Sequence, residues 1–443
     1  MLQRRGRGFR GSPTGLKLAL IAFLSLALLI PLSMLSGITR ERRQRQAEAI
    51  EETSASWAGE LELLSPVLVM PLVYEYRNAK NEVELGKRQV ILYPEELAVK
   101  ARVQPELRKR GIFTVPLYSC EAAVSGRFVL PPLEEFGTDA VRLLWEQASF
   151  ALPLSSYQGL REAPSLDWAG RSLELDAPKP DMDYGGQVLA ARLGPGAWKE
   201  GGFELGLSLR GSGSLGFKPE AKSARVELES SWTSPSFFGS ALPDARSFGE
   251  GGMEASWRTA RFGLGPRILA EEELGEAVDY EPAFGFSLFQ PQGVYQKTDR
   301  ALKYGLLFVI IPFAALFLFE SLKGSRIHAI QYLFIGLANC LFFLLLLALS
   351  EHLAFDAAFV LAAGAVTCLC SGYSAFVLPR RRDGLAMAGL FAALYAYMFA
   401  ALKSEDYALL IGAVGLLAIL ALVMIATRKL DWYRLDRRES EDA

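Results

Sequence analysis

Two groups of polar side chains lie where apolar stretches of this sequence end. The first group is Glu320, His328, Gln331 and Tyr332, and the second is Ser350, Glu351 and His352. Histidine titrates near physiological pH, and ionisable groups at a membrane boundary can relay protons. Boundary groups also reach water and lipid headgroups at little cost, and a whole apolar stretch separates the two groups. We therefore interpret them as anchoring groups, with recognition of a lipid or partner and proton-coupled transport as alternatives.

The motifs that position catalytic groups are missing from the sequence. It has no Walker A loop, no G-x-S-x-G elbow, no H-E-x-x-H and no dinucleotide fingerprint. The segment Gly211-Ser212-Gly213 lies in a predicted hairpin with no helix after it, so it does not indicate a phosphate-binding loop. We expect a protein that is not an enzyme.

Metal and disulfide sites are not expected either. The chain has two histidines and four cysteines, and Cys120 is the one cysteine of its polar part. One cysteine cannot staple its own domain, and a zinc site built from His and Cys needs several converging ligands. A formal net charge of −2 gives no argument for nucleic acid binding. The sequence therefore predicts no metal, no cofactor and no nucleic acid partner.

Six apolar segments are long enough to cross a bilayer as helices, since a hydrocarbon core of about 30 Å needs about 20 residues. They are Leu16–Ile38, Tyr304–Leu322, Ile330–Leu349, Ala357–Leu378, Gly384–Leu402 and Tyr407–Thr427. Gly364, Cys368 and Gly372 recur every four residues, which predicts a close helix-packing face.

The first apolar segment is predicted to be an uncleaved anchor. Its apolar core is longer than that of a signal peptide, and no Ala-x-Ala cleavage site follows it. A twin-arginine signal is a poor fit to the residues after Arg4-Arg5. Pro31 lies inside the segment and is expected to kink the helix.

Lys and Arg residues in the short loops set the predicted orientation. Basic residues follow the second, fourth and sixth segments, whereas the loops between them are acidic or mixed. We therefore expect a bacterial inner-membrane protein with both termini in the cytoplasm and a large periplasmic domain. The predicted parts are a cytoplasmic N-terminus (1–15), an anchor helix (16–38), the periplasmic domain (39–303), a five-helix bundle (304–427) and a cytoplasmic tail (428–443).

The periplasmic part reads as all-β after a charged helical stalk over 40–60. Short β-branched or aromatic runs are bounded by Pro and Gly, a pattern typical of paired sheets or a sandwich. The predicted strands are Pro66–Tyr76, Gln89–Tyr93, Gly111–Tyr118, Gln187–Arg192, Phe203–Leu209, Ala224–Ser231 and Gly252–Arg258. We expect two sub-sheets joined near 130–135. The fold class is thus a membrane protein with six helices, one plus five, and a sandwich-like β-domain.

Two further stretches combine aromatic and polar residues. The first contains Trp232, Pro235, Phe237 and Gly239, and forms either a buried corner or an exposed binding loop. The second lies at the start of the second membrane segment and contains Tyr295, Gln296, Asp299, Arg300 and Lys303. Tyr and Lys suit the headgroup layer, so anchoring to membrane lipids is the first interpretation, and contact with a partner is the alternative.

Several of these motifs resemble the CreD family of bacterial inner-membrane proteins, almost from end to end of the chain. The resemblance is carried by Tyr295–Tyr304, Phe319-Glu320, Arg326-Ile327-His328, Gln331-Tyr332, Leu344–Leu349, Ser350-Glu351-His352, Trp232, Pro235-Ser236-Phe237, Gly239, Leu242-Pro243, Arg108, Arg110-Gly111-Ile112 and Asp431-Trp432-Tyr433. It implies a role in cell envelope integrity under a two-component regulatory system, and it implies no reaction, cofactor or substrate.

The sequence also departs from the family pattern in three places. Ser65-Pro66 stands where the family has Gly-Pro, and His328-Ala329 stands where it has His-Pro. A Ser-Asp-x-Arg-Gly stretch is replaced by Ser155-Ser156-Tyr157-Gln158-Gly159, so the acid–base pair of that stretch is missing here. We expect a non-enzymatic envelope protein whose outer domain contacts an envelope protein or cell-wall component, with a proton-coupled or small-molecule transporter as the alternative.

The orientation can be tested with reporters fused after residue 200. An alkaline phosphatase fusion is expected to be active and a green fluorescent protein fusion dark, because that point lies between the first and second predicted spans. The opposite pattern would place the domain in the cytosol and overturn the predicted layout.

Overall fold

The structure is a computed structural model that describes residues 13–177, 187–194, 200–249, 251–269, 283–288, 293–323, 327–378, 380–404 and 408–428. The chain divides into two compact units. Residues 1–46 and 292–443 form a helical unit, and residues 47–291 form a β-unit. The division lies a few residues inside the predicted 39–303 domain, because the charged stalk begins within the helical unit and a short helix before the second span belongs to it.

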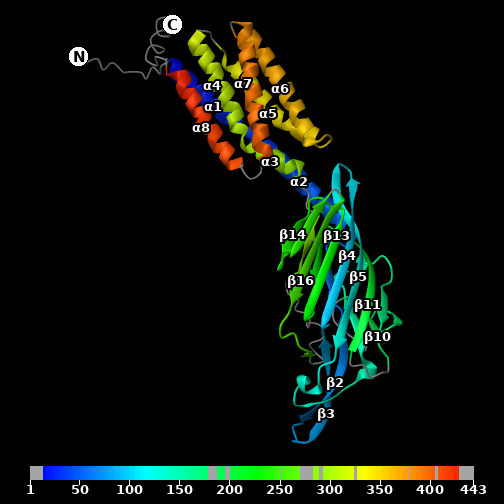
Figure 1. The fold of residues 1–443 in the computed structure, drawn as a ribbon. Helices are drawn as coiled ribbons and strands as arrows, with labels where there is room; N and C mark the ends of the chain where they lie inside the picture. Colours follow the sequence, from blue (N-terminus) through cyan, green and yellow to red (C-terminus); the bar gives the residue numbers. More distant parts are fainter. Residues whose placement is uncertain are drawn as a thin grey trace, which may run out of the picture. The chain divides into compact units, whose positions relative to one another are not determined.

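The helical unit joins the two ends of the chain, so its helices come from both termini (Figure 1). Its helices are α1 (Pro13–Ala27), α2 (Leu29–Ala55), α3 (Val294–Lys303), α4 (Gly305–Lys323), α5 (Ala329–Ser350), α6 (Phe355–Val377), α7 (Arg381–Lys403) and α8 (Ala408–Thr427). Leu28, Leu32 and Leu35 pack into the same buried cluster as Phe342 and Phe359. The N-terminal helices are therefore part of the bundle core and not a separate tether.

Two breaks interrupt these helices. The first apolar segment is divided at Leu28, three residues before Pro31. Pro31 has no N–H to donate to the carbonyl of Ala27, and its ring crowds that carbonyl. Backbone hydrogen bonds continue through this point, from Leu28 N–H to the carbonyl of Leu24 and from Leu32 N–H to that of Leu28, so the kink itself stays a prediction. The second is a bend of 42° between α3 and α4.

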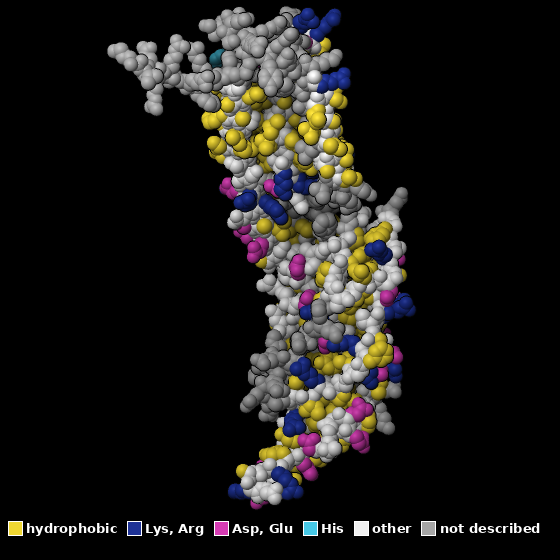
Figure 2. Space-filling view, turned by 90° about the vertical axis from the view of Figure 1, so that its left-hand side faces the viewer, with side chains coloured by type: hydrophobic (Ala, Val, Ile, Leu, Met, Phe, Trp, Pro, Cys, Tyr) yellow, Lys and Arg dark blue, Asp and Glu magenta, His cyan; other side chains and the backbone are white. Residues whose placement is uncertain are grey.

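Within the described residues, four helices are long and apolar enough to cross a membrane, or five if the bent α3–α4 pair counts as one span. Helix α8 adds another apolar stretch, Ala408–Thr427. Figure 2 shows hydrophobic side chains gathered in a band over the helices, with charged side chains at its border. Exposed Phe23, Leu341 and Leu369 belong to this apolar surface. The chain is a membrane protein with several apolar helices, and the count of six spans stays a prediction.

The predicted small-residue packing face is wrong for the described part of the bundle. Gly364 and Gly372 of α6 have no described atom within 4 Å of the position a Cβ would take, and Cys368 is exposed. These residues lie on the outward side of α6. Its inward side carries Phe359, Ala362 and Val366 instead.

The β-unit consists of strands and three short 3₁₀ turns in its described residues, apart from the end of α2. Its strands are β1 (Leu61–Leu64), β2 (Val67–Arg77), β3 (Val83–Leu92), β4 (Glu96–Arg110), β5 (Phe113–Val129), β6 (Ala140–Leu143), β7 (Ser149–Pro153), β8 (Ser165–Trp168), β9 (Arg171–Glu174), β10 (Val188–Arg192), β11 (Glu200–Ser212), β12 (Ser214–Lys218), β13 (Ser223–Ser230), β14 (Ser236–Gly239), β15 (Ala245–Gly249), β16 (Gly252–Ala260), β17 (Arg267–Leu269) and β18 (Phe284–Ser287). The predicted all-β character and all seven predicted strands are present.

These strands form three sheets where two were predicted. The largest has the order β15-β16-β13-β4-β5-β11-β8-β9. A second has β10-β7-β2-β3-β17 with β6 beside β2, and a third has β1-β12-β18-β14. The predicted junction near 130–135 is the passage from β5 of the largest sheet to β6 of the second. The third sheet was missed because its four-to-five-residue strands come from four distant parts of the sequence.

One face of the largest sheet packs against the other two sheets, which gives a sandwich. Along β4, Leu97, Val99, Ala101 and Val103 are buried while the residues between them face solvent. This alternation follows the two-residue period of a strand. Phe128 and Trp168 of the largest sheet pack against Phe150 of the second, with ring centroids 6.3 Å and 6.2 Å apart. Trp257 packs on Phe217 and Phe284 of the third sheet.

The predicted hairpin at 211–214 is wrong. Strand β11 pairs with β5 and β8, whereas β12 pairs with β1 and β18 in another sheet. The chain turns from one sheet to the next at Gly213, whose φ of +71° suits glycine. The turn signal was read correctly, but a local signal does not say which strand the next one will pair with.

The charged stalk is helical, as predicted, and reaches the β-unit as the end of α2. Arg110 forms an ion pair with Glu52 and donates to Thr53 Oγ1 at 3.4 Å. Arg108 lies over the ring of Trp57, 4.4 Å from its centroid. Gly111 has a φ of +62° at the first position of the two-residue β4–β5 turn, so the Arg-Gly motif forms the hairpin that meets the stalk.

The aromatic core gives a stability prediction. Phe128→Ala removes a ring that is fully buried between two sheets, so we expect a loss of about 3–5 kcal/mol in the free energy of unfolding. Phe248→Ala is the matched control, because that ring is 54% exposed and should change stability by less than about 0.5 kcal/mol. Pulse proteolysis of the full chain in urea measures both. Equal effects of the two substitutions would contradict this sandwich core.

Candidate functional site

Glu320 is the centre of one predicted group, at the end of α4. Its carboxylate forms an ion pair with Lys17 of α1 and accepts from the backbone N–H of Ile327 at 3.1 Å. The hydroxyl of Tyr332 donates to its other oxygen at 3.0 Å. Lys17 also donates to the carbonyl of Ile327 at 3.1 Å. With 11% of its side chain exposed, Glu320 is held by three groups from three segments of the bundle.

Glu351 is the centre of the other predicted group, directly after α5. The hydroxyl of Tyr295 on α3 donates to its carboxylate at 3.1 Å, and Arg42 Nε of α2 lies 3.6 Å from it. The Glu351 side chain is also 11% exposed. The two groups share one design, in which a nearly buried carboxylate binds a tyrosine hydroxyl and a cation of the N-terminal helices.

The two groups are not joined by a polar path in the described residues. Between them, Phe308, Phe342 and Phe359 surround Tyr395, with ring centroids 4.6 to 6.5 Å from that of Tyr395. Tyr395 donates to Asn339 Oδ1 at 3.1 Å. The middle of the bundle is therefore packed with aromatic rings around one hydrogen-bonded pair, which favours anchoring over proton relay.

The remaining helix-end residues have structural contacts. His328 and Gln331 form a capping box on α5, in which His328 Nδ1 accepts from Ile330 N at 3.3 Å and Gln331 Oε1 accepts from His328 N at 2.9 Å. Ser350 is buried and donates to the carbonyl of Leu347 at 2.9 Å. His352 is exposed. A capping role satisfies amides that a helix start leaves without partners.

Helix α3 carries the predicted headgroup residues on two sides. Tyr295 is buried in the bundle, while Gln296 and Lys303 are exposed. Asp299 and Lys303 form an ion pair at 3.5 Å along the helix, and Arg300 is partly buried. Tyr295 therefore joins the Glu351 group, and the others form the outer surface of a short amphipathic helix.

The Trp232–Gly239 stretch lies against the core of the β-unit. Trp232 and Phe237 are half-buried, and the ring of Phe237 meets Trp257 edge-on with centroids 5.8 Å apart. Trp232 Nε1 donates to the carbonyl of Ser234 at 3.0 Å. Pro235 and Gly239 bound the short strand β14, and Gly239 has a φ of +98° beside Phe284. This geometry is that of a packed corner.

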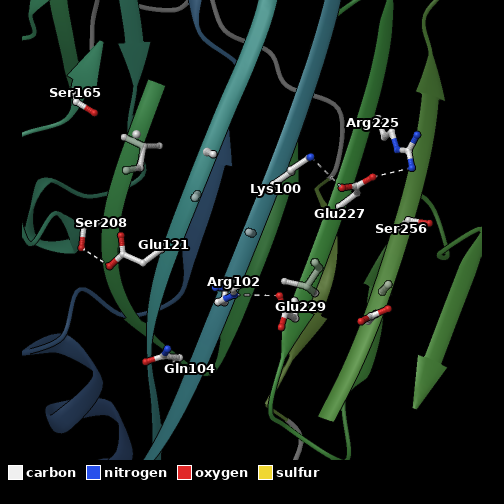
Figure 3. Close-up of a pocket in the computed structure, with 18 of the residues that line it drawn as sticks. Lys100, Arg102, Gln104, Glu121, Ser165, Ser208, Arg225, Glu227, Glu229 and Ser256 are labelled. Carbon is white, nitrogen blue, oxygen red and sulfur yellow. Dashed lines mark hydrogen bonds and ion pairs between the residues drawn. The ribbon is translucent and has the colours of Figure 1, made fainter. Parts of the chain in front are cut away.

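One hollow of the β-unit was not predicted from the sequence. It is a groove of about 1060 Å³ on the solvent-facing side of the largest sheet, which we term the sheet groove (Figure 3). Strands β16, β13, β4, β5 and β11 supply its floor, and β15 and the residues before β8 supply its margins. No aromatic residue is among the described residues that line it.

Strand register arranges the groove side chains in two rows across the sheet. One row reads Ser165, Gly206, Ala123, Lys100, Glu227, Ser256 and Ala245. The next row reads Ser208, Glu121, Arg102, Glu229, Glu254 and Ser247. Charged residues thus occupy the middle of the groove, and small residues lie at its two sides.

The charges of the groove pair with one another, two of the pairs between β4 and β13 and one within β13. Arg102 Nε lies 3.0 Å from Glu229, Arg225 lies 2.7 Å from Glu227, and Lys100 lies 3.9 Å from Glu227. Ser208 donates to Glu121 at 2.7 Å. The Arg102–Glu229 pair is more than half exposed, and exposed pairs contribute only about 0–1 kcal/mol each. These side chains can therefore exchange partners at little cost.

Two features of the described residues bear on reactive chemistry. No group of three His, Cys, Asp or Glu residues among them could hold a metal ion. Burial raises the pKa of the Cys120 thiol to about 12, so this thiol stays protonated and unreactive. Burial also holds the pKa of the Tyr118 hydroxyl well above its usual value, and that hydroxyl donates to the carbonyl of Ser214 at 2.8 Å.

Comparison with known proteins supports the resemblance seen in the motifs. The family model described as Inner membrane protein CreD matches residues 13–433. Inner membrane protein CreD of Escherichia coli (strain K12) is 30% identical over 429 residues, which are 95% of this chain and 94% of that protein. The match includes both helical ends and the β-unit between them.

The Lys17–Glu320 pair gives a stability prediction for the helical unit. Lys17→Met leaves a nearly buried carboxylate without its cation, so we expect a loss of about 2 kcal/mol, less than the ~3–5 kcal/mol of a fully buried pair because Lys17 is partly exposed. The melting temperature of the full chain in detergent should fall by about 4–8 °C.

Lys403→Met is the matched control for this measurement. Lys403 pairs with Asp356 at 3.2 Å, but both side chains are more than half exposed, so the melting temperature should hardly change. In the double variant Lys17→Met/Glu320→Met, the loss of unfolding free energy should be smaller than the sum of the losses in the two single variants. Additive losses would show that the two residues do not interact.

Proposed function

This chain belongs to the CreD family of inner membrane proteins, and from that membership we propose that it is a non-catalytic envelope protein whose β-unit contacts an envelope component outside the membrane. The helical unit would hold the protein in lipid with both termini in the cytoplasm. The β-unit would present its binding surface in the periplasm and contribute there to cell envelope integrity.

The orientation part of the proposal rests on charge. Arg380 lies between α6 and α7, Arg382 lies in the first turn of α7, and Arg428 follows α8, whereas Asp356 lies in the first turn of α6 on the opposite side of the bundle. Positive loops face the cytoplasm, so the ends of α6 and α8 are assigned to that side. Lys17 at the start of α1 agrees with this assignment. Arg326 and the tail basic residues Lys429, Arg434, Arg437 and Arg438 lie outside the described residues.

The sheet groove is the observation that carries the binding part of the proposal. A sheet that packs on one side and meets only solvent on the other normally presents a row of long polar side chains there. In this sheet, Gly206, Ala123 and Ser208 are small, and they leave a hollow of about 1060 Å³, in the size range of ligand sites. A concave surface whose charged side chains can exchange their partners is suited to binding a polar partner.

Transport is the second function considered, and the bundle gives it less support. A transporter needs polar groups near the middle of the membrane. The described middle holds Asn339 and Tyr395, which hydrogen-bond to each other inside a cluster of aromatic rings. Glu320 and Glu351, the two carboxylates that could carry protons, are occupied at opposite helix ends.

Site-specific photo-crosslinking in living cells tests the proposal. A photoreactive residue in place of Ser208 or Ser256 should give a crosslinked species, because both positions face the groove. Ser172 on β9 is the matched control, since it is exposed on the same sheet outside the groove. Arg102→Glu should remove the species and increase the sensitivity of the cells to detergent. Equal crosslinking at Ser172, or a species that persists in Arg102→Glu, would refute groove binding.

A further inference from the structure

The charges of the sheet groove are not mixed evenly but separated along its strands. At one end, Arg225 of β13 lies opposite Arg258 of β16 in the register. Four residues further along β13, Glu229 lies opposite Glu254. Like charges directly opposite each other destabilise a sheet, yet this strand pair contains one such pair of each sign.

At the basic end of the groove, the cationic side chains outnumber the carboxylates that pair with them. Arg225 and Lys100 both pair with the single carboxylate of Glu227. Figure 3 shows Lys100 and Arg225 pointing toward Glu227 from its two sides. Arg258 has its own partner in Asp244, at 3.7 Å. A carboxylate of a ligand would find two exposed cations at this end.

The acidic end has one carboxylate in excess, because Glu121 pairs with Arg161 at 3.9 Å and only Glu254 is left without a described ion pair. Arg102 faces Glu229 on β13 and is in register with Glu121 on β5. Its guanidinium pairs with Glu229 at 3.0 Å. No described cation forms an ion pair with Glu254, which is exposed and lines the groove. An ammonium group of a ligand would therefore be attracted to Glu254 and Glu229.

The spacing of the two ends sets the length of the ligand. Arg225 and Glu229 are four residues apart on one strand, which is about 13 Å at ~3.3 Å per residue. An extended peptide of about four residues has the same length between its free ends. The groove has no aromatic lining residue among those described, so it offers no stacking surface for a ring.

We propose that the sheet groove binds a short oligopeptide of about four residues, with its free carboxylate at Arg225 and Lys100 and its free ammonium at Glu229 and Glu254. This inference rests on the proposed function, because it names the class of component that the groove contacts. The small residues Gly206, Ala123 and Ser256 leave room for the peptide backbone beside the charged rows.

Binding of tetra-alanine to the purified full chain in detergent, measured by calorimetry at low salt, tests the inference. N-acetylation or C-amidation of the peptide should each weaken binding about threefold to fivefold, the effect of one exposed charge contact. Glu254→Gln should weaken binding of the free peptide, and N-acetylation should then have a smaller further effect because Glu229 remains, while C-amidation keeps its full effect. Arg225→Gln should show the reverse pattern.

Glu174→Gln is the matched control, because Glu174 is exposed on β9 of the same sheet and lies outside the groove. It should leave binding unchanged. Equal binding of free and doubly blocked peptides, or no binding, would overturn this inference. If crosslinking at Ser208 and Ser256 nevertheless exceeds that at Ser172, the proposed function stands and only the peptide assignment fails. Absence of that crosslinking would refute the proposed function itself.

Discussion

Peptide groups inside a bilayer have no water to bond, so every N–H and C=O there must find a partner within the protein. This constraint explains why the apolar stretches of the described chain are helical and why polar side chains gather where the helices stop. Glu320 accepts from the N–H of Ile327, and His328 with Gln331 caps the start of α5. Residues whose types could do acid–base chemistry are thus used to complete the backbone hydrogen bonding of the helix ends and to hold the N-terminal helices in the bundle.

Local sequence signals predicted the elements better than their partners. The helices follow from length and apolarity, and the seven predicted strands from β-branched and aromatic runs. Strand β4 was not predicted, although its buried Leu97, Val99 and Ala101 alternate with outward residues such as Lys100 and Arg102. The sheet change at Gly213 was read as a hairpin, since a turn residue specifies the bend and not the strand to which the chain pairs next. The third sheet joins strands from β1 to β18 and has no local signature.

The helix-end residues could be predicted as a set because sequence places them together. Their bonds to Lys17 and Arg42 could not, because about 300 residues separate each cation from its carboxylate. The sheet groove is harder still. Its floor uses two or three outward residues from each of five strands, and each of them reads in the sequence as an ordinary solvated polar or small residue. Only the register shows that Glu254 lies opposite Glu229 and that Gly206 and Ala123 are neighbours.

Burial separates the ion pairs of this protein into two kinds. Glu320 and Glu351 have little exposure, so removing their cations leaves a charge that water cannot reach, and these pairs fix the arrangement of the helices. The pairs of Arg102 and Lys100 are exposed, so replacing them by neutral residues should change the stability of the sheet by no more than about 1 kcal/mol. The like charges that lie opposite each other, Arg225 with Arg258 and Glu229 with Glu254, even cost stability. Such a loss of stability is expected at a surface that binds a partner, because the partner supplies the opposite charges that the sheet lacks.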